Sequence, residues 1–308
     1  LRYIHKPIRQ KDLFNVIRNI LSTAPLDQPS TDRKITVAIN TLFKDTAVLI
    51  AEDNPVNQQV ASAMLNNLGL RITLANNGQE ALEQIKKEHF DLVLMDCQMP
   101  VLDGYEATAM IRQLPDGRGK HIPIIAITAN AMSDDRQKCL DVGMNDFLSK
   151  PFTLTQLKTI IERWLADSNR NKDQTQQGMP SSILKERNIS DNSVINMKKL
   201  NTYCQLDPNG DNTFLKRLLS IYLSSTPVYF SQIEQAIQIR DHKTLKHAAH
   251  TLKSSSVNVG AEKLSEMCQQ LENFAKMQQV ELTDELLVKI RAEFEQVIKT
   301  LQELLTAL

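Results

Sequence analysis

The sequence predicts two domains of different class: a doubly wound α/β domain with a five-stranded parallel sheet, and then an all-α antiparallel helical bundle. The chain has 308 residues, enough for about two domains. Between residues 47 and 166, short apolar runs alternate with stretches of helical periodicity, whereas residues 192–308 show helical periodicity and no strand pattern. Two polar segments, 22–46 and 167–191, are interpreted as linkers, the second one flexible, and they leave a short N-terminal stub, 1–21.

The predicted sheet takes its strands from five apolar runs: 47–51, 71–75, 92–95, 124–128 and 147–149. The stretches between and after them have helical spacing, at 55–68, 79–87, 104–113, 133–142 and 153–165, and a loop with Pro115, Gly117 and Gly119 precedes the fourth strand. Strands that are apolar almost throughout are typical of a sheet covered on both faces, which favours parallel pairing.

The predicted bundle begins after Asp211 and Asn212, which are good helix N-cap residues. Thr226 followed by Pro227 indicates a second helix start, because proline is favoured at the first helical position. Amphipathic stretches continue to Leu304, so we expect an antiparallel core of four helices.

Composition excludes several classes of function. Lys plus Arg number 36 and Asp plus Glu number 36, so the net charge of zero disfavours a nucleic-acid-binding protein. The charge is distributed unevenly, since residues 47–166 hold 11 Lys and Arg against 15 Asp and Glu. This acidic block could hold a cation, although a solvated surface is the simpler explanation.

The cysteines and apolar runs predict a cytoplasmic location. The four cysteines are far apart in the sequence: Cys97, Cys139, Cys204 and Cys268. They form no CxxC pair, which disfavours a zinc site and a disulfide framework. No apolar run reaches the roughly 18–20 residues that span a bilayer, so we expect no membrane contact from this chain. Because the chain begins with Leu1, we expect a piece of a longer protein, which could be anchored through preceding segments.

Polar side chains follow four of the predicted strands where each strand ends: Glu52 and Asp53, Asp96, Thr128, and Lys150. Ligands of an open parallel sheet bind at this edge, so we expect these side chains to converge. Clustered carboxylates suit Mg²⁺, and one carboxylate could then attack a phosphoryl group. Asp96 ends the predicted central strand and is the best nucleophile candidate. Mg²⁺, the Lys150 ammonium and the Thr128 hydroxyl would stabilise the transferring phosphoryl group. A single Asp after a strand can also be a simple turn former. Five polar residues at the ends of the predicted strands favour a phosphoryl-transfer site instead.

The middle block resembles a response-regulator receiver domain with a flavodoxin-like sheet. The resemblance rests on VLIAEDNPVNQQVA, DLVLMDCQMPVLDGYEA, IIAITANA and DFLSKPF. It implies that Asp96 accepts a phosphoryl group and that Mg²⁺ is held by Glu52, Asp53, Asp96 and the backbone carbonyl of Gln98. It further implies that Thr128 is the switch hydroxyl and that Phe147 is the switch aromatic, here without a hydroxyl of its own. Lys150 would contact the phosphoryl group, and the Lys150–Pro151 peptide bond would be cis. Cys97 is interpreted as a small buried residue.

A histidine stands out in the C-terminal block. Helical spacing places His250 opposite an apolar stripe, which predicts an exposed imidazole with Lys253 and Ser254 as surface neighbours. The segment HTLKSSSVNVG resembles the motif of the histidine phosphotransfer (Hpt) domain, which implies that His250 is a phosphoacceptor and that Lys253 screens the added charge. His242 and His247 are interpreted as ordinary solvent-exposed histidines.

The N-terminal segment YIHKPIRQKDLFNVIRNIL resembles the end of another receiver domain, although an isolated amphipathic helix is the alternative. The chain shows no ATP-binding motif, because its one GxG, at 117–119, lies in a loop, and it shows no helix-turn-helix. The sequence therefore predicts the C-terminal part of a hybrid sensor histidine kinase. Phosphoryl groups would pass from an upstream kinase histidine to Asp96, to His250 and on to a separate response regulator. The alternative is a non-catalytic docking module that transfers no phosphoryl group.

Overall fold

The computed structural model of the chain describes residues 43, 46–129, 133–166, 194–207, 211–279 and 284–308. The predicted N-terminal stub 1–21 and linker 167–191 lie outside these residues. The same holds for the predicted linker 22–46 apart from Phe43 and Thr46.

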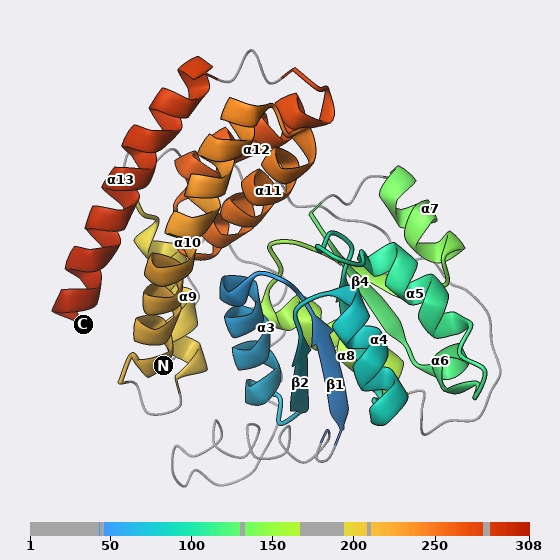
Figure 1. Ribbon diagram of the computed structural model, residues 1–308. Coiled ribbons are helices and arrows are strands. Elements are labelled where there is room, and N and C mark those ends of the chain that lie inside the picture. Colours follow the sequence, from blue (N-terminus) through green and yellow to red (C-terminus); the bar gives the residue numbers. More distant parts are fainter. Residues whose placement is uncertain (1–42, 44–45, 130–132, 167–193, 208–210, 280–283) are drawn as a thin grey trace, which may run out of the picture. The chain divides into compact units, whose positions relative to one another are not determined.

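The α/β domain contains the predicted five-stranded sheet (Figure 1). All neighbouring strands are parallel and their order is β2-β1-β3-β4-β5. The strands are β1 (Ala47–Ala51), β2 (Arg71–Ala75), β3 (Leu92–Asp96), β4 (Ile124–Thr128) and β5 (Asp146–Ser149). This arrangement confirms the predicted fold class.

Burial explains why these runs form the sheet. Every residue of β1, β3 and β4 is buried, whereas β2 and β5, at the two edges, are partly exposed. The register pairs Ala51 with Met95 and Asp96 with Ile127, so these strands end at nearly the same level. The residues that follow the strands are thereby brought to one edge of the sheet.

The helices of the α/β domain follow the predicted alternation. They are α3 (Pro55–Asn67), α4 (Gly78–Lys87), α5 (Gly104–Arg112), α6 (Arg118–His121), α7 (Ser133–Asp141) and α8 (Leu154–Ala166). Helix α6 is a single short turn inside the segment predicted as a loop. Asn54 caps α3, since its side chain accepts a hydrogen bond from the backbone N–H of Val56.

The described residues of the C-terminal domain form helices and their connections and contain no strand, as predicted. It consists of α9 (Met197–Tyr203), the 3₁₀ turn η2 (Cys204–Leu206), α10 (Thr213–Ile239), α11 (His242–Asn258), α12 (Glu262–Lys276) and α13 (Asp284–Ala307). Helix α11 packs between α10 and α12, and α13 packs against both α10 and α12. Short connections make α10, α11 and α12 antiparallel neighbours.

The predicted helix start at Thr226 is wrong, because α10 continues through Pro227. The hydroxyl of Thr226 donates to the carbonyl oxygen of Tyr222 at 2.7 Å instead of capping a new helix. Buried side chains continue across the proline from Tyr222 through Phe230 to Ile233. Packing of this stripe outweighs the hydrogen bond that the proline removes.

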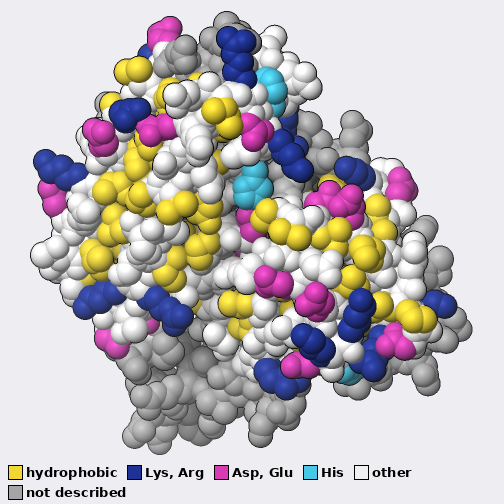
Figure 2. All heavy atoms as spheres, in the orientation of Figure 1, with side chains coloured by type: hydrophobic (Ala, Val, Ile, Leu, Met, Phe, Trp, Pro, Cys, Tyr) yellow, Lys and Arg dark blue, Asp and Glu magenta, His cyan; other side chains and the backbone are white. Residues whose placement is uncertain are grey.

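The α/β domain and the bundle belong to one compact unit, in which α3 packs against α10 and α11. Figure 2 shows hydrophobic side chains gathered on the visible face of the bundle, and basic and acidic side chains interspersed over the α/β domain. Among the described helices, none combines the length and the apolarity needed to cross a bilayer.

Candidate functional site

Three carboxylates converge at the carboxyl edge of the sheet. Glu52, Asp53 and Asp96 each place an oxygen within 4.8 Å of the others. Glu52 and Asp96 are each only 2% exposed. The ammonium of Lys150 donates to Glu52 Oε2 at 2.6 Å and to Asp96 Oδ2 at 2.7 Å. The sheet therefore brings together residues that lie far apart in the sequence, as the strand-end pattern predicted.

Burial and charge control protonation in this cluster. Burial raises the pKa of Glu52 to about 8, against the opposing effect of the Lys150 ammonium. Burial alone would lower the pKa of Lys150, but the charges of Asp96 and Glu52 raise it above its ordinary value. Lys150 is thus a fixed cation beside acids that also suit a divalent ion. Clustered carboxylate oxygens are the ligand type that Mg²⁺ prefers.

Four further residues implied by the receiver resemblance lie on or next to β3, β4 and β5. Thr128 is buried at the end of β4, and the backbone N–H of Gln98 donates to Asp96 Oδ1 at 3.2 Å. Phe147 is half-buried, with the guanidinium carbon of Arg136 5.3 Å from its ring centroid. The Lys150–Pro151 peptide bond is cis, as expected.

Cys97 is a buried thiol, as predicted. Its Sγ lies 3.9 Å from Sγ of Cys139. Contact with Cys139, together with burial, raises the pKa of Cys97 far above its ordinary value. The residue next to Asp96 is therefore a buried packing group.

His250 is buried, and the prediction that it is exposed is wrong. The residue is 5% exposed, and both ring nitrogens lack a hydrogen-bond partner within the described part of the chain. The helical-wheel argument allowed α11 one buried face, whereas α11 packs against α10, α12 and also α3. The small side chains at 254–256 predict that a partner can approach this part of the helix closely, and here the approaching element is α3.

Glu272 on α12 is a site residue that the sequence analysis missed. Its carboxylate is 1% exposed, accepts from Lys253 Nζ at 2.6 Å, and has Oε1 3.5 Å from His250 Nδ1. The ammonium of Lys276 lies 2.7 Å from Oε1. Burial opposes ionisation, but contacts with His250 and Lys253 leave the pKa of Glu272 well below its usual range. Lys253, expected to screen a phosphoryl group, is paired with Glu272 and Gln269.

His247 was also misinterpreted as a solvent-exposed histidine. Its Nε2 lies 3.0 Å from Asp53 Oδ2, and its side chain is 32% exposed. His247 precedes His250 by three residues, so both lie on neighbouring parts of the same helix surface. This surface of α11 therefore faces the acid cluster.

A polar contact joins the two domains beside both candidate sites. Asn54 Nδ2 donates to the carbonyl oxygen of Thr251 at 3.0 Å. Asn54 directly follows Asp53, and Thr251 directly follows His250. The acid cluster and the histidine are thus each one residue away from the same hydrogen bond.

Comparisons with protein families agree with this geometry. Residues 48–162 match the response regulator receiver domain, and residues 217–305 match the Hpt domain. The chain contains a receiver domain followed by an Hpt domain. The acid cluster lies in the first matched range and His250 in the second, and this combination indicates phosphorelay signalling.

Relatives of the chain include hybrid and sensor histidine kinases. The sensor histidine kinase GacS of Pseudomonas protegens is 30% identical over 232 residues, which cover 75% of this chain and 24% of that protein. Hybrid signal transduction histidine kinase K of Dictyostelium discoideum is 44% identical over 129 residues, or 40% of this chain and 11% of that protein. The chain therefore spans less than a quarter of either relative.

A solved receiver domain of a sensor histidine kinase from Pseudomonas aeruginosa is 48% identical, with a TM-score of 0.38, over 40% of this chain and 98% of that one. That crystal structure contains a magnesium ion coordinated in the active site cleft.

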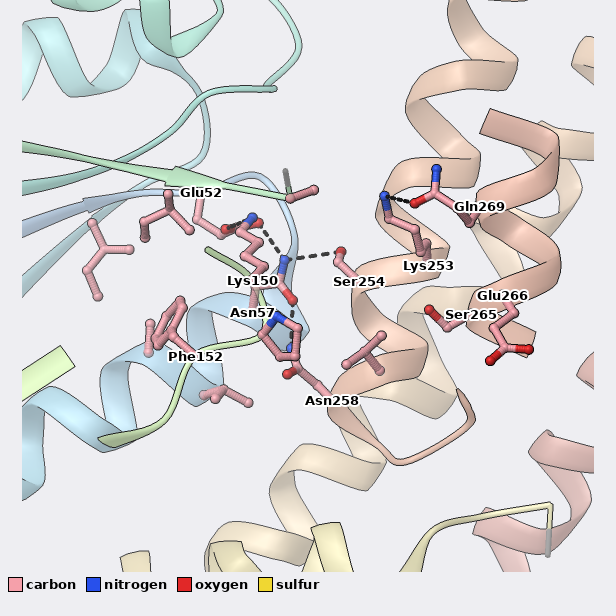
Figure 3. A pocket seen from close by; sticks show the side chains of 17 residues that line it. Glu52, Asn57, Lys150, Phe152, Lys253, Ser254, Asn258, Ser265, Glu266 and Gln269 are labelled. Carbon is pink, nitrogen blue, oxygen red and sulfur yellow. Dashed lines mark hydrogen bonds and ion pairs between the residues drawn. The ribbon is translucent and has the colours of Figure 1, made fainter. Parts of the chain in front are cut away.

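A cavity of about 280 Å³ lies between the receiver and Hpt domains, beside the acid cluster. Figure 3 shows Glu52, Asn57, Lys150 and Phe152 on one side, and Lys253, Ser254 and Asn258 on the other. Asn57 points from the receiver domain towards Ser254 and Asn258. Polar contact between the domains thus extends along α3 from Asn54 to Asn57.

Proposed function

We propose that this chain relays a phosphoryl group between Asp96 of the receiver domain and His250 of the Hpt domain. One observation carries the proposal: the Asn54–Thr251 hydrogen bond joins the residue after Asp53 to the residue after His250. Helix α11 thereby lies against the edge of the sheet that holds the acids, the position that direct transfer between the two residues requires.

We assign Mg²⁺ to Glu52, Asp53, Asp96 and the backbone carbonyl of Gln98. The three carboxylates supply hard oxygen donors within 4.8 Å of one another, which is the chemistry that this ion needs. When bound, Mg²⁺ neutralises charge on the oxygens of the transferring phosphoryl group.

In the first step, a carboxylate oxygen of Asp96 attacks phosphorus as the bond from phosphorus to the donor imidazole breaks. Lys150, held 2.7 Å from Asp96 Oδ2, supplies an ammonium to the phosphoryl oxygens, and the Thr128 hydroxyl supplies a second donor. In the second step, an imidazole nitrogen of His250 attacks and the bond from phosphorus to Asp96 breaks. Since Nδ1 faces Glu272, we assign Nε2 as the attacking nitrogen.

The chain needs a donor and a final acceptor that it does not itself supply. We propose that the donor is the histidine of a kinase core in the same parent polypeptide, because the relatives of the chain are histidine kinases several times its length. The acceptor from His250 is the receiver domain of a separate response regulator. We place this exchange in the cytoplasm, where the four free thiols of the chain would persist.

Labelling of the full chain with a small phosphodonor and Mg²⁺ tests the proposal. Wild type should acquire an acyl phosphate and then an acid-labile, base-stable label. His250→Gln should lose only the second label, and Asp96→Asn should lose both. His242→Gln and Asp116→Asn are the matched controls and should label like wild type. Transfer that persists in both site variants would contradict the assignment, and wild type that never labels would favour a docking module.

A further inference from the structure

We propose that the Hpt surface beside His250 selects its receiver partner by recognising a side-chain amide. The recognising surface consists of the Thr251 carbonyl and the hydroxyls of Ser254 and Ser255, and it is called the acceptor patch below. In this chain the amide is that of Asn54. The inference rests on the proposed phosphotransfer. It adds a rule for which receiver domains can exchange a phosphoryl group with His250.

The side-chain amide of Asn54 is held by three acceptors. Its Nδ2 lies 3.0 Å from the Thr251 carbonyl oxygen, 3.0 Å from Ser254 Oγ and 2.8 Å from Ser255 Oγ. Asn54 is 1% exposed, so water does not replace these partners. An N–H₂ group has two protons, and here it faces three acceptors.

The two serines can only accept at this surface. Ser254 Oγ and Ser255 Oγ each donate to the Thr251 carbonyl, at 3.0 and 2.9 Å. A hydroxyl has one proton, so both protons are committed within α11. The acceptor patch therefore presents lone pairs and no proton, and it matches a donor from the partner.

The amide of Asn54 cannot be reversed. Its Oδ1 accepts from the backbone N–H of Val56 at 3.0 Å and caps α3. The N-cap therefore fixes the oxygen on the receiver side and directs the nitrogen at the acceptor patch. The same residue type serves the fold and the recognition.

Asn57 extends the pattern one turn further along α3 (Figure 3). Its Nδ2 donates to Glu52 Oε1 at 2.8 Å and contacts Ser254 Oγ at 3.2 Å. Its Oδ1 accepts from Asn258 Nδ2 at 2.7 Å. Contact with Glu52 fixes this amide too, so the Hpt surface meets donors near Ser254 and an acceptor at Asn258.

A receiver without a donor at the position of Asn54 would bury the acceptor patch unpaired. A buried polar group without its partner is unfavourable, and a carboxylate there would also repel the carbonyl. The partner class is therefore a receiver domain with a side-chain N–H donor, best a carboxamide, directly after its second acid.

The test measures transfer from phosphorylated Asp96 to His250 in the full chain. Asn54→Asp and Asn54→Ser keep a good N-cap residue, so the start of α3 is preserved. We expect transfer to slow by roughly tenfold or more in Asn54→Asp and less in Asn54→Ser, because a buried donor is lost. Asn66→Asp, an exposed change on the same helix, should transfer like wild type.

A second variant approaches from the Hpt side. Ser254→Ala combined with Ser255→Ala removes two acceptors and touches no residue of the acid cluster. In this background Asn54→Asp should slow transfer by a smaller factor than it does alone, since the two changes affect one contact. The serine variants still test the amide recognition if Asn54→Asp disturbs the neighbouring acids.

Labelling of Asp96 by the small phosphodonor separates the two proposals. If wild type labels at Asp96 and never at His250, the proposed function fails. If wild type transfers, and the Asn54 and serine variants transfer equally fast, only the amide recognition is wrong. The amide recognition would also be wrong if the factors by which Asn54→Asp and the serine variants slow transfer simply multiply when the changes are combined.

Discussion

The imidazole Nε2 of His247 lies 3.0 Å from Oδ2 of Asp53. A side chain of the Hpt domain thus contacts one of the carboxylates that we assign to Mg²⁺. The contact occupies one of the two carboxylate oxygens of Asp53, so we expect it to weaken Mg²⁺ binding there without excluding the ion.

Removal of this imidazole should therefore strengthen Mg²⁺ binding. We expect His247→Ala to bind Mg²⁺ roughly two- to fivefold more tightly, the range that partly exposed ionic contacts produce. Titration calorimetry on the full chain measures the affinity, with His242→Ala as the matched control. An unchanged or weaker affinity in His247→Ala would show that the contact does not compete.

Lys150 compensates two buried acids, so its removal should destabilise the metal-free protein. In Lys150→Met we expect a loss of about 3–5 kcal/mol in the free energy of unfolding, because Glu52 and Asp96 are left without their cation. Mg²⁺ should restore more stability to this variant than to wild type. Urea unfolding with and without Mg²⁺ measures both effects.

Lys158→Met is the matched control, since Lys158 forms a partly exposed pair with Glu162. Its cost should stay within about 1 kcal/mol. A comparable loss in both variants would mean that the ion pairs of Lys150 contribute nothing special to stability.

Glu272 should contribute stability that is lost in acid. Its pKa lies below the ordinary value of 4.5, so the folded state holds the carboxylate in its charged form more strongly than the unfolded state does. The contribution is fully present above about pH 4.5 and declines as the pH falls below it. The unfolding free energies of wild type and Glu272→Gln should differ by a constant amount from pH 5.5 to 7 and converge below pH 4.5. A difference that grows in acid would reverse the assigned sign.

Gly104 should be essential for the position of Asp96. A Cβ at Gly104 would overlap the carbonyl oxygen of Asp96, so Gly104→Ala must displace the end of β3. We expect a loss of about 1–3 kcal/mol in stability and slower labelling of Asp96 by a small phosphodonor. Glu106→Gln, an exposed change on the same helix, is the control. Wild-type labelling in Gly104→Ala would show that the strand end tolerates the shift.

The sequence by itself determined the sheet and the edge at which its acids meet. Apolar runs such as Ala47–Ala51 and Leu92–Met95 are typical of strands in a sheet covered on both faces, and the structure buries them there. In parallel strands the following residues, Glu52 and Asp96 among them, must then reach the same edge. Local patterns sufficed because the fold repeats one unit, a strand followed by a helix.

Only the tertiary structure decided the surroundings of His250. Its burial, the Glu272 carboxylate and the Asp53–His247 contact all depend on how α11 packs against α12 and α3. Periodicity reports one buried face of a helix and cannot report how many neighbours cover it. The partners Asn54 and Thr251 are 197 positions apart, so no local pattern connects them. Their contact follows from matching donors and acceptors on the facing surfaces of two domains.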